Sequence, residues 1–232
     1  MISIVTVNWN SPDWLSLMLE SLERFTDFPY NVVVIDNSND PSPVSRSSGV
    51  RQVFTRRNLG HGLGLNMGVQ IEKAAFGNKF VMFLDVDCHA LVQDWDIPFL
   101  EQMEKYDIVA GRGVPVKPIR PACMFMKSEI AQKYDWKDTP GYKGHRVTPE
   151  GFDVAIPAYH LMREDNVSLG LLEAQKNHYG TLNGEEWCVD GNPLIYHHWH
   201  GSHLVERQVD FPEDDLIADK KLLFSKIPWR VL

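Results

Sequence analysis

Cysteine is scarce in this sequence, and its spacing excludes two kinds of architecture. Three cysteines, Cys88, Cys123 and Cys188, are spread over 232 residues, and no two of them form a CxxC pair. Neither a disulfide framework nor a structural zinc cluster fits this spacing. Widely separated cysteines are typical of a reducing compartment, and we therefore expect a cytoplasmic protein.

Long apolar runs and a secretory leader are missing as well. No stretch approaches the roughly 20 apolar residues that a transmembrane helix needs. The first residues, Met1–Asn8, have no basic segment and become polar too early for a signal peptide. We therefore expect a soluble protein.

The sequence also lacks an excess of basic residues. Its 23 lysines and arginines face 31 aspartates and glutamates, which gives a formal net charge of -8 at pH 7. A nucleic-acid partner bound through a broad basic face is therefore disfavoured. The segment 220–230 alternates basic and apolar groups, so it could make peripheral contact with an anionic membrane, or pack on the domain or on a second subunit.

What the sequence does contain is a buried strand pattern that ends in two carboxylates. Phe80–Leu84 is apolar without alternation, as expected for a strand covered on both faces of a parallel sheet. Asp85 and Asp87 follow, and side chains two apart on a strand share a face. Oxygen ligands of this kind suit Mg²⁺ or Mn²⁺ together with a phosphate-bearing substrate. The alternative is that one aspartate caps the next segment and the other is a solvated turn residue.

The order of the elements before this strand predicts an α/β fold. Ile2–Val7 and Tyr30–Ile35 have the pattern of buried strands, and Val50–Thr55 is a third candidate. Between the first two, Ser11 and Pro12 mark a helix start, with serine as the cap. A strand, a helix and a strand in succession predict a right-handed parallel crossover. Ligands of such sheets bind beyond the carboxyl ends of the strands, where the two aspartates fall.

A glycine-rich stretch, Arg56–Gly68, leads into the helix that is predicted to end near Ala75. Glycines let a backbone approach a ligand closely, and N–H groups at a helix start suit phosphates. The spacing matches neither GxGxxG nor a P-loop, so it supports neither a dinucleotide fold nor a P-loop. From these residues alone, contact with a ligand and a plain flexible loop are both open.

Two later segments carry candidate chemistry. Asp153 precedes a predicted helix, where it is either a cap favoured by the helix dipole or a general base. The stretch Leu194–His203 is rich in histidine. If it forms a strand, His198 and His200 share one face and His197 lies on the other. Imidazole is a frequent metal ligand, and histidines bonded to backbone or water are the alternative.

Five segments together resemble one enzyme family. They are Val5–Asn8, Val34–Ser38, Arg57–Gly60, Asn66–Gly68 and Leu84–Asp87. Their residues, order and spacing are similar to those of GT-A fold glycosyltransferases of family 2, which are inverting and contain a DxD motif.

The resemblance implies a fold and a division of the chain. The fold would be α/β, a Rossmann-like and mostly parallel central sheet flanked by helices. One GT-A domain would span residues 1–209, with a nucleotide-sugar-binding half (1–110) and an acceptor half (111–209). Residues 210–232 would form a C-terminal tail.

The resemblance also implies roles around a nucleotide sugar. Asp36 is similar to the aspartate that contacts the base of the donor, and the backbone near Val7 and Asn8 would line the same pocket. The other residues implied around the nucleotide are Asn58, Gly60, Asn66 and Asp85.

A metal site is implied at the diphosphate. Asp85 and Asp87 look like the DxD pair that holds Mn²⁺ or Mg²⁺. His198 looks like the third ligand, and His200 is the alternative because it shares the same face. The cation would neutralise charge on the departing nucleoside diphosphate.

A carboxylate base is implied by the family as well. Asp153 is the expected base that deprotonates the acceptor hydroxyl, with Glu185 and Glu186 as alternatives. A base that activates the acceptor hydroxyl for direct attack on the sugar would give transfer by single displacement, with inversion.

The implied activity is transfer of a sugar from a nucleoside-diphosphate donor, expected to be UDP-linked, to an acceptor hydroxyl. Saccharides, lipid-linked glycans and a hydroxymethylated DNA base are open as acceptors, and the acidic charge disfavours the last. Outside enzymes, the alternative is a non-catalytic nucleotide-sugar or glycan-binding module, against which the retained carboxylates argue. A nucleotidyltransferase would need a basic, glycine-rich loop after the first strand, where Asn8–Pro12 stands.

Overall fold

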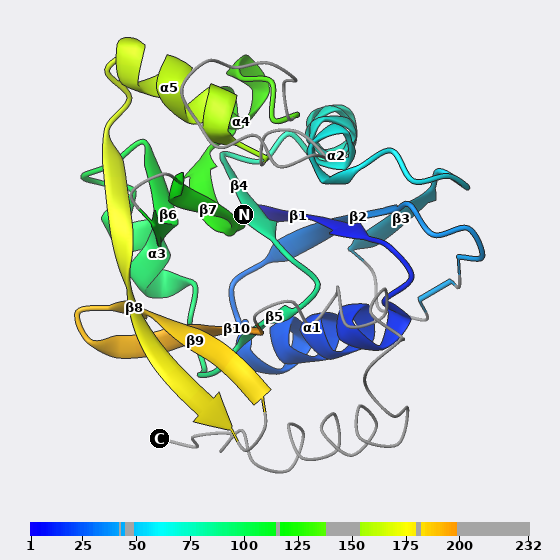
Figure 1. Cartoon of the computed structure of the whole chain (residues 1–232), viewed down its shortest axis with the longest axis horizontal. Helices are drawn as coiled ribbons and strands as arrows, with labels where there is room; N and C mark the ends of the chain where they lie inside the picture. Colours follow the sequence, from blue (N-terminus) through cyan, green and yellow to red (C-terminus); the bar gives the residue numbers. More distant parts are fainter. Residues whose placement is uncertain (42, 45–48, 115–116, 138–153, 180–181, 199–232) are drawn as a thin grey trace.

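The structure of the chain is a computed structural model that describes residues 1–41, 43–44, 49–114, 117–137, 154–179 and 182–198 (Figure 1). Within these ranges the strands are β1 (Ile2–Asn8), β2 (Tyr30–Asp36), β3 (Val50–Phe54), β4 (Phe80–Leu84), β5 (Cys88–Ala90), β6 (Ile108–Val114), β7 (Lys117–Lys127), β8 (Leu169–Tyr179), β9 (Leu182–Val189) and β10 (Asn192–His198). The helices are α1 (Pro12–Phe25), α2 (His61–Ala75), α3 (Ile97–Gln102), α4 (Ser128–Lys133) and α5 (Ile156–Glu164). The predicted tail, residues 210–232, lies outside the described residues, and the predicted division of the chain stays a prediction.

The described strands form one sheet in the order β3-β2-β1-β4-β7-β6-β8-β9-β10-β5. β3, β2, β1 and β4 pair in parallel, as do β6 and β8, whereas the other pairs are antiparallel. The predicted α/β class, with a central sheet flanked by helices, is confirmed. The parallel arrangement holds as far as β4, and beyond it hairpins make the sheet largely antiparallel, because a short connection can join only antiparallel neighbours.

The hairpin from β9 to β10 is closed by Asp190 and Gly191, whose φ angles are 50° and 77°. Two consecutive residues with positive φ in a two-residue connection are typical of a type I′ turn. This turn sets the register in which Val189 lies opposite Asn192. β10 pairs on its other side with β5, which follows closely after β4 (Figure 1).

Helices cover both faces of the parallel part of the sheet (Figure 1). α1 lies on one face, where its apolar side chains, including Trp14 and Leu22, join one core, and α2, α4 and α5 lie on the other. α1 begins as predicted, with Ser11 at the cap position and Pro12 in the first turn, although the Ser11 hydroxyl donates to Trp9 O (3.0 Å) instead of capping. Across the described ranges, no helix has both the length and the apolar character to cross a membrane.

The glycines inside α2 let this helix lie close to its neighbours. A Cβ at Gly64 would stand 2.7 Å from a methyl carbon of Val7, and one at Gly68 would collide with Val5, so both glycines bring α2 onto β1. Gly62 lies in the same way against the segment that follows α4. Of the stretch Arg56–Gly68, the part from His61 onward lies in α2, where Gly62, Gly64 and Gly68 serve close packing, and contact with a ligand stays a prediction.

We predict that Gly62→Ala destabilises the fold. The added Cβ would lie 2.5 Å from Lys137 Cα and 2.6 Å from Trp136 O, which are backbone atoms and cannot rotate away. Overpacking of this kind costs about 1–3 kcal/mol of unfolding free energy, measurable by urea denaturation. Gln70→Ala, at an exposed position of the same helix, is the control and should change stability by less than about 0.5 kcal/mol. Equal stability of the two variants would contradict the packing role.

Asp107 ties three strands together at the start of β6. Its carboxylate accepts hydrogen bonds from Lys127 Nζ (2.5 Å) at the end of β7, and from Ser168 Oγ (2.7 Å) and Ser168 N (3.0 Å) just before β8. The Lys127 ammonium and the Ser168 donors lower the pKa of Asp107 to about 2. The folded protein therefore holds this carboxylate ionised at a pH where the unfolded chain already binds a proton.

The stability that Asp107 contributes should disappear in acid. Because its folded pKa lies below its ordinary value of 3.8, the contribution is complete above that value and is lost as the pH falls through about 2. Asp107→Asn should lower the unfolding free energy by about 1 kcal/mol near neutral pH, and the difference from wild type should shrink in acid. Urea titrations across this pH range measure the difference. A difference that stays constant with pH would show that the charge is not responsible.

Candidate functional site

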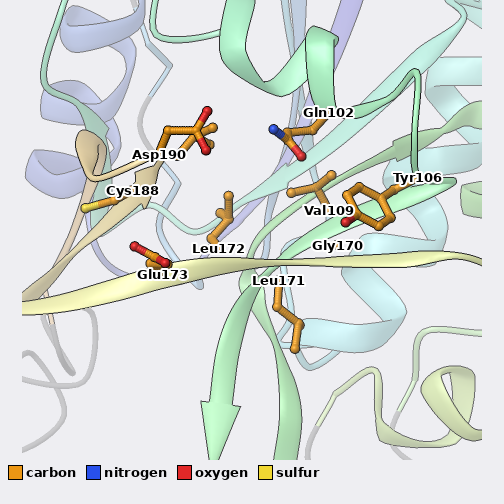
Figure 2. A pocket seen from close by; sticks show the side chains of 10 residues that line it. Gln102, Tyr106, Val109, Gly170, Leu171, Leu172, Glu173, Cys188 and Asp190 are labelled. Atoms are coloured by element: carbon orange, nitrogen blue, oxygen red, sulfur yellow. The ribbon is translucent and has the colours of Figure 1, made fainter.

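A cavity of about 140 Å³ lies between α3, β6, β8 and β9 (Figure 2). Its lining includes the carboxylates of Glu173 and Asp190 and the side chains of Gln102 and Tyr106. None of the residues that the family resemblance implied lines this cavity. Most of the implied residues lie instead near the carboxyl ends of the parallel strands.

The carboxyl ends of β1 and β2 carry two of the predicted nucleotide contacts. Asn8 and Asp36 are partners in the parallel register, and Asn37 N donates to Asn8 O at 2.8 Å. Asp36 is 1% exposed, and its carboxylate accepts hydrogen bonds from Ser38 N (3.0 Å) and from the Gln52 amide (2.8 Å). A buried carboxylate that is held from two sides offers a fixed acceptor for an N–H donor.

Asn58 and Gly60 form the turn that leads into α2 beside the same edge. Asn58 Oδ1 accepts a hydrogen bond from Gly60 N (2.8 Å), and Gly60 O accepts one from Asn37 Nδ2 (3.2 Å). Gly60 has a φ of 81°, a conformation that favours glycine. Val7 is half-buried and packs against α2. Hydrogen bonds and register therefore join this turn to the ends of β1 and β2.

Asn66 is engaged with a different part of the chain. Its Nδ2 donates to Asp135 Oδ1 (2.6 Å), and its Oδ1 accepts from Trp136 N (2.9 Å). These bonds tie the second turn of α2 to the segment after α4. Both polar atoms of the amide hold the fold, and a role beside the nucleotide stays a prediction.

The two aspartates after β4 lie in a turn. β4 ends at Leu84, and Cys88 N donates to Asp85 O at 2.9 Å. The expectation that strand alternation gives Asp85 and Asp87 a common face is therefore wrong, because neither belongs to the strand. Each carboxylate meets a different imidazole, and Asp85 Oδ1 lies 3.1 Å from Nε2 of His61, the first residue of α2.

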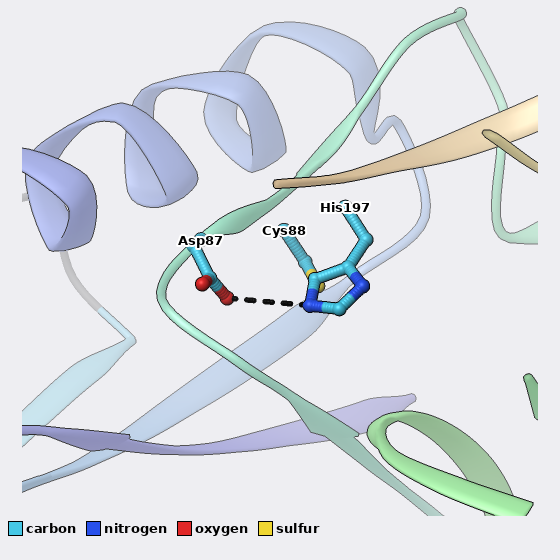
Figure 3. Close-up of side chains that lie close together, drawn as sticks. All are labelled: Asp87, Cys88 and His197. Carbon is cyan, nitrogen blue, oxygen red and sulfur yellow. Dashed lines mark ion pairs between the residues drawn. The ribbon is translucent and has the colours of Figure 1, made fainter. Parts of the chain in front are cut away.

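Asp87 meets His197, which comes from the far end of the described chain (Figure 3). Asp87 Oδ1 lies 3.7 Å from His197 Nε2, and both side chains are nearly buried. Their ligand atoms and Cys88 Sγ all lie within 4.8 Å of one another. His197 is paired with Cys88 in the antiparallel register, and His198 N donates to Asp87 O at 3.0 Å. A carboxylate beside an imidazole can hold a divalent cation.

The charges around His197 raise its pKa. Burial lowers the pKa of His197, but the Glu185 carboxylate, 3.5 Å from Nδ1, and the charges of Asp87 and Asp85 outweigh burial and raise it. Burial and the charges of Asp87 and Asp85 raise the pKa of the Cys88 thiol well above its usual value. A protonated thiol is a poor ligand for a hard cation, whereas His197 offers a nitrogen ligand once a cation displaces its proton, so the suitable donors are Asp87 and His197.

His198, the predicted third ligand, packs on the other face of β10. The centroid of its ring lies 4.7 Å from that of Trp14 and 5.2 Å from that of His89. Burial and the neighbouring His89 and His197 lower the pKa of His198 to about 2. The predicted alternation of the strand is found, but the imidazole that the structure brings to Asp87 is that of His197, which the sequence assigned to the opposite face.

Two predicted residues, Asp153 and His200, lie outside the described residues, so the structure does not place them. The alternative bases Glu185 and Glu186 are buried in β9. Glu185 accepts a hydrogen bond from Arg120 at 2.8 Å.

Sequence reasoning missed several residues that support the predicted ones. They are His61 beside Asp85, Gln52 beside Asp36, and Arg120 beside Glu185. Each comes from a different element, and each contact depends on how distant segments pack. The pattern of a single strand or helix contains no signal for such a partner.

Solved structures of S. aureus TarS resemble this fold. One TarS structure is 15% identical, has a TM-score of 0.52, and is matched over 97% of this chain and 44% of its own. TarS 1–349 is 14% identical with a TM-score of 0.51, and its complex with UDP is 15% identical with a TM-score of 0.50; each is matched over 97% of this chain and 72% of its own. The chain thus spans less than half of the longer TarS chain. At this identity the likeness shows the fold alone. No curated protein matches the chain.

The family follows from a comparison of sequence. The model of Glycosyl transferase family 2 matches residues 3–168, which is more than half of the chain. The matched region contains β1 to β7 and the aspartates Asp36, Asp85 and Asp87. The resemblance inferred from the first five segments is confirmed, and the chain belongs to glycosyl transferase family 2.

Proposed function

We propose that this glycosyltransferase moves a sugar from a UDP-linked donor to an acceptor hydroxyl with the help of Mn²⁺ or Mg²⁺. One observation carries the proposal. A buried aspartate from the turn after β4 meets a buried histidine of β10, at the edge where the parallel strands end. The ends of parallel strands in an α/β sheet are the usual place for a ligand.

Asp87 and His197 fit the proposed cation. A carboxylate oxygen and an imidazole nitrogen belong to the donor types that Mn²⁺ accepts, and the two side chains come from segments that face each other across the β5–β10 pair. Asp85, two residues earlier in the same turn and 27% exposed, would contribute a further carboxylate oxygen. When bound, the cation supplies neutralisation of the charge on the departing UDP.

Asp36 supports a uridine nucleotide in the proposal. Its carboxylate receives two hydrogen bonds from the protein and offers only acceptors to a ligand. Uracil presents a ring N–H, which such an acceptor favours, whereas cytosine presents a lone pair at that position. The structural relative TarS 1–349 has been solved with UDP.

Asp153 is the proposed base that takes the proton of the acceptor hydroxyl during a single, inverting displacement. Glu185 and Glu186 suit this role less because they are 3% and 4% exposed, and Glu185 is paired with Arg120. We propose a saccharide or lipid-linked hydroxyl as the acceptor, since the net charge of -8 disfavours nucleic acid. The three free cysteines accord with the proposed cytoplasmic location.

Mn²⁺ should strengthen UDP binding, and the gain should vanish in Asp87→Asn and His197→Asn. Each variant removes one proposed ligand, so Mn²⁺-dependent affinity should fall by roughly 10-fold or more while metal-free UDP binding stays unchanged. Isothermal titration calorimetry measures both affinities. His160→Asn, on α5, is the matched histidine control.

His198→Asn tests whether His197 or His198 is the histidine that binds the cation. Loss of the Mn²⁺ gain in this variant, together with its retention in His197→Asn, would overturn the placement of the cation between Asp87 and His197. Absence of any Mn²⁺ gain in the wild-type protein would overturn metal dependence itself.

A panel of UDP-sugars should contain one that the wild-type protein slowly hydrolyses to UDP. If Asp153 is the base, Asp153→Asn should slow this hydrolysis by roughly 100-fold or more, because general-base assistance is lost. Affinity for Mn²⁺ and UDP should not change. A coupled assay for released UDP gives the rate, and Glu104→Gln, an exposed position, is the control. An unchanged rate would assign the base to another residue.

A further inference from the structure

A buried carboxylate, Glu185, lies beside His197 and forms an ion pair with Arg120. Glu185 Oε1 lies 3.5 Å from His197 Nδ1 and 2.8 Å from Arg120 Nη1. Glu185 is 3% exposed, and the Arg120 side chain is 26% exposed. The imidazole is thus flanked by two carboxylates, Glu185 at Nδ1 and Asp87 at Nε2.

Strand register explains why these groups meet. Glu185 of β9 lies directly opposite His197 of β10 in the antiparallel ladder. Trp187, two residues further along β9 and so on the same face, stacks on the His197 ring with centroids 4.9 Å apart and an angle of 23°. The ring therefore stacks on an indole, and the Glu185 carboxylate lies 3.5 Å from its Nδ1.

Both nitrogens of His197 face a carboxylate, so a tautomer is selected only when a cation takes the place of the hydrogen at Nε2. With a cation between Nε2 and Asp87, the hydrogen would stay on Nδ1, which lies 3.5 Å from Glu185 Oε1, and the Nε2 lone pair would face the cation. Imidazoles that ligate metals commonly donate their other N–H to a carboxylate, which orients the ring and raises its basicity. Around His197, Glu185 Oε1 lies 3.5 Å from Nδ1, at the place of such a carboxylate.

Arg120 stabilises the charged carboxylate of Glu185 in this buried environment. A buried charge is unfavourable unless an opposite charge pairs with it and hydrogen bonds satisfy it. The guanidinium, which reaches Glu185 from β7, supplies both. The same pairing makes Glu185 unsuitable as the base for an acceptor, because its Oε1 already faces a guanidinium and an imidazole.

We propose that Glu185 is a positioning residue for the cation site. When the cation binds, Glu185 keeps the hydrogen of His197 on Nδ1 so that the Nε2 lone pair faces the cation, and Arg120 stabilises Glu185 in turn. The inference rests on the proposed function, since it requires that Asp87 and His197 take the cation. It replaces the alternative in which Glu185 is the catalytic base.

The first test measures the tautomer directly and needs no variant. In the protein loaded with Mg²⁺ and UDP, ¹⁵N NMR of labelled histidine should show His197 protonated at Nδ1, with Nε2 carrying no hydrogen. Assignment uses His197→Asn. A His197 protonated at Nε2 in this complex overturns the proposal.

The second test uses Glu185→Gln, which keeps the size of the side chain and removes its charge. Mn²⁺-dependent UDP affinity should fall by roughly 10- to 100-fold, the range found for residues behind a metal ligand. Metal-free UDP affinity should not change. Pulsed electron paramagnetic resonance of bound Mn²⁺ should show a weakened coupling to an imidazole nitrogen. Glu173→Gln, at an exposed position of β8, is the matched control.

A double variant separates positioning from a purely structural role. Glu185→Gln alone leaves the Arg120 guanidinium unpaired, which can lower stability, whereas Arg120→Gln with Glu185→Gln removes both charges and should melt closer to wild type. We expect the double variant to keep the weakened Mn²⁺ affinity. A folded double variant that binds Mn²⁺ and UDP as wild type does would overturn the proposal. If the wild-type protein shows no Mn²⁺ dependence, the proposed cation site fails, and this inference fails with it.

Discussion

The antiparallel pairing of β10 with β5 fixes the position of the imidazole on which the candidate site depends. It sets His197 opposite Cys88, and the bond from His198 N fastens the strand to Asp87 O. Because β5 follows closely after the turn at the end of β4, the same pairing holds the aspartates near the ends of the parallel strands. A slip of one residue would turn every side chain of β10 to the opposite face and exchange His197 for His198.

Buried charge is the second constraint at this place. Arg120, Glu185, His197 and Asp87 follow one another across β7, β9, β10 and the turn after β4, with acidic and basic groups in alternation. In a low-dielectric interior each of these charges needs a partner, so the arrangement is stable only as a whole. A proton on His197 and a cation beside it would use the same nitrogen, and binding of the cation would therefore release the proton.

The edge formed by β1, β2 and the start of α2 depends on close packing instead. Gly64 and Gly68 bring α2 onto β1, and this approach carries the first residue of the helix, His61, to Asp85. The turn before the helix is joined to the ends of β1 and β2 through Asn37. Larger residues at Gly64 and Gly68 would move α2 away from β1, and His61 with it. The packing of the core therefore also sets the distance between His61 and Asp85.

The sequence by itself determined the class of fold and its first strands and helix, because those signals are local. The unbroken apolar run Phe80–Leu84 and the helix start at Ser11 act within a few residues, and both elements are found. The alternation of β10 was also local, and it separated His197 from His198. Which of the two faces Asp87 was decided only by the tertiary structure, because it depends on the pairing of β10 with β5 and β9, and no pattern within one strand records its distant partners.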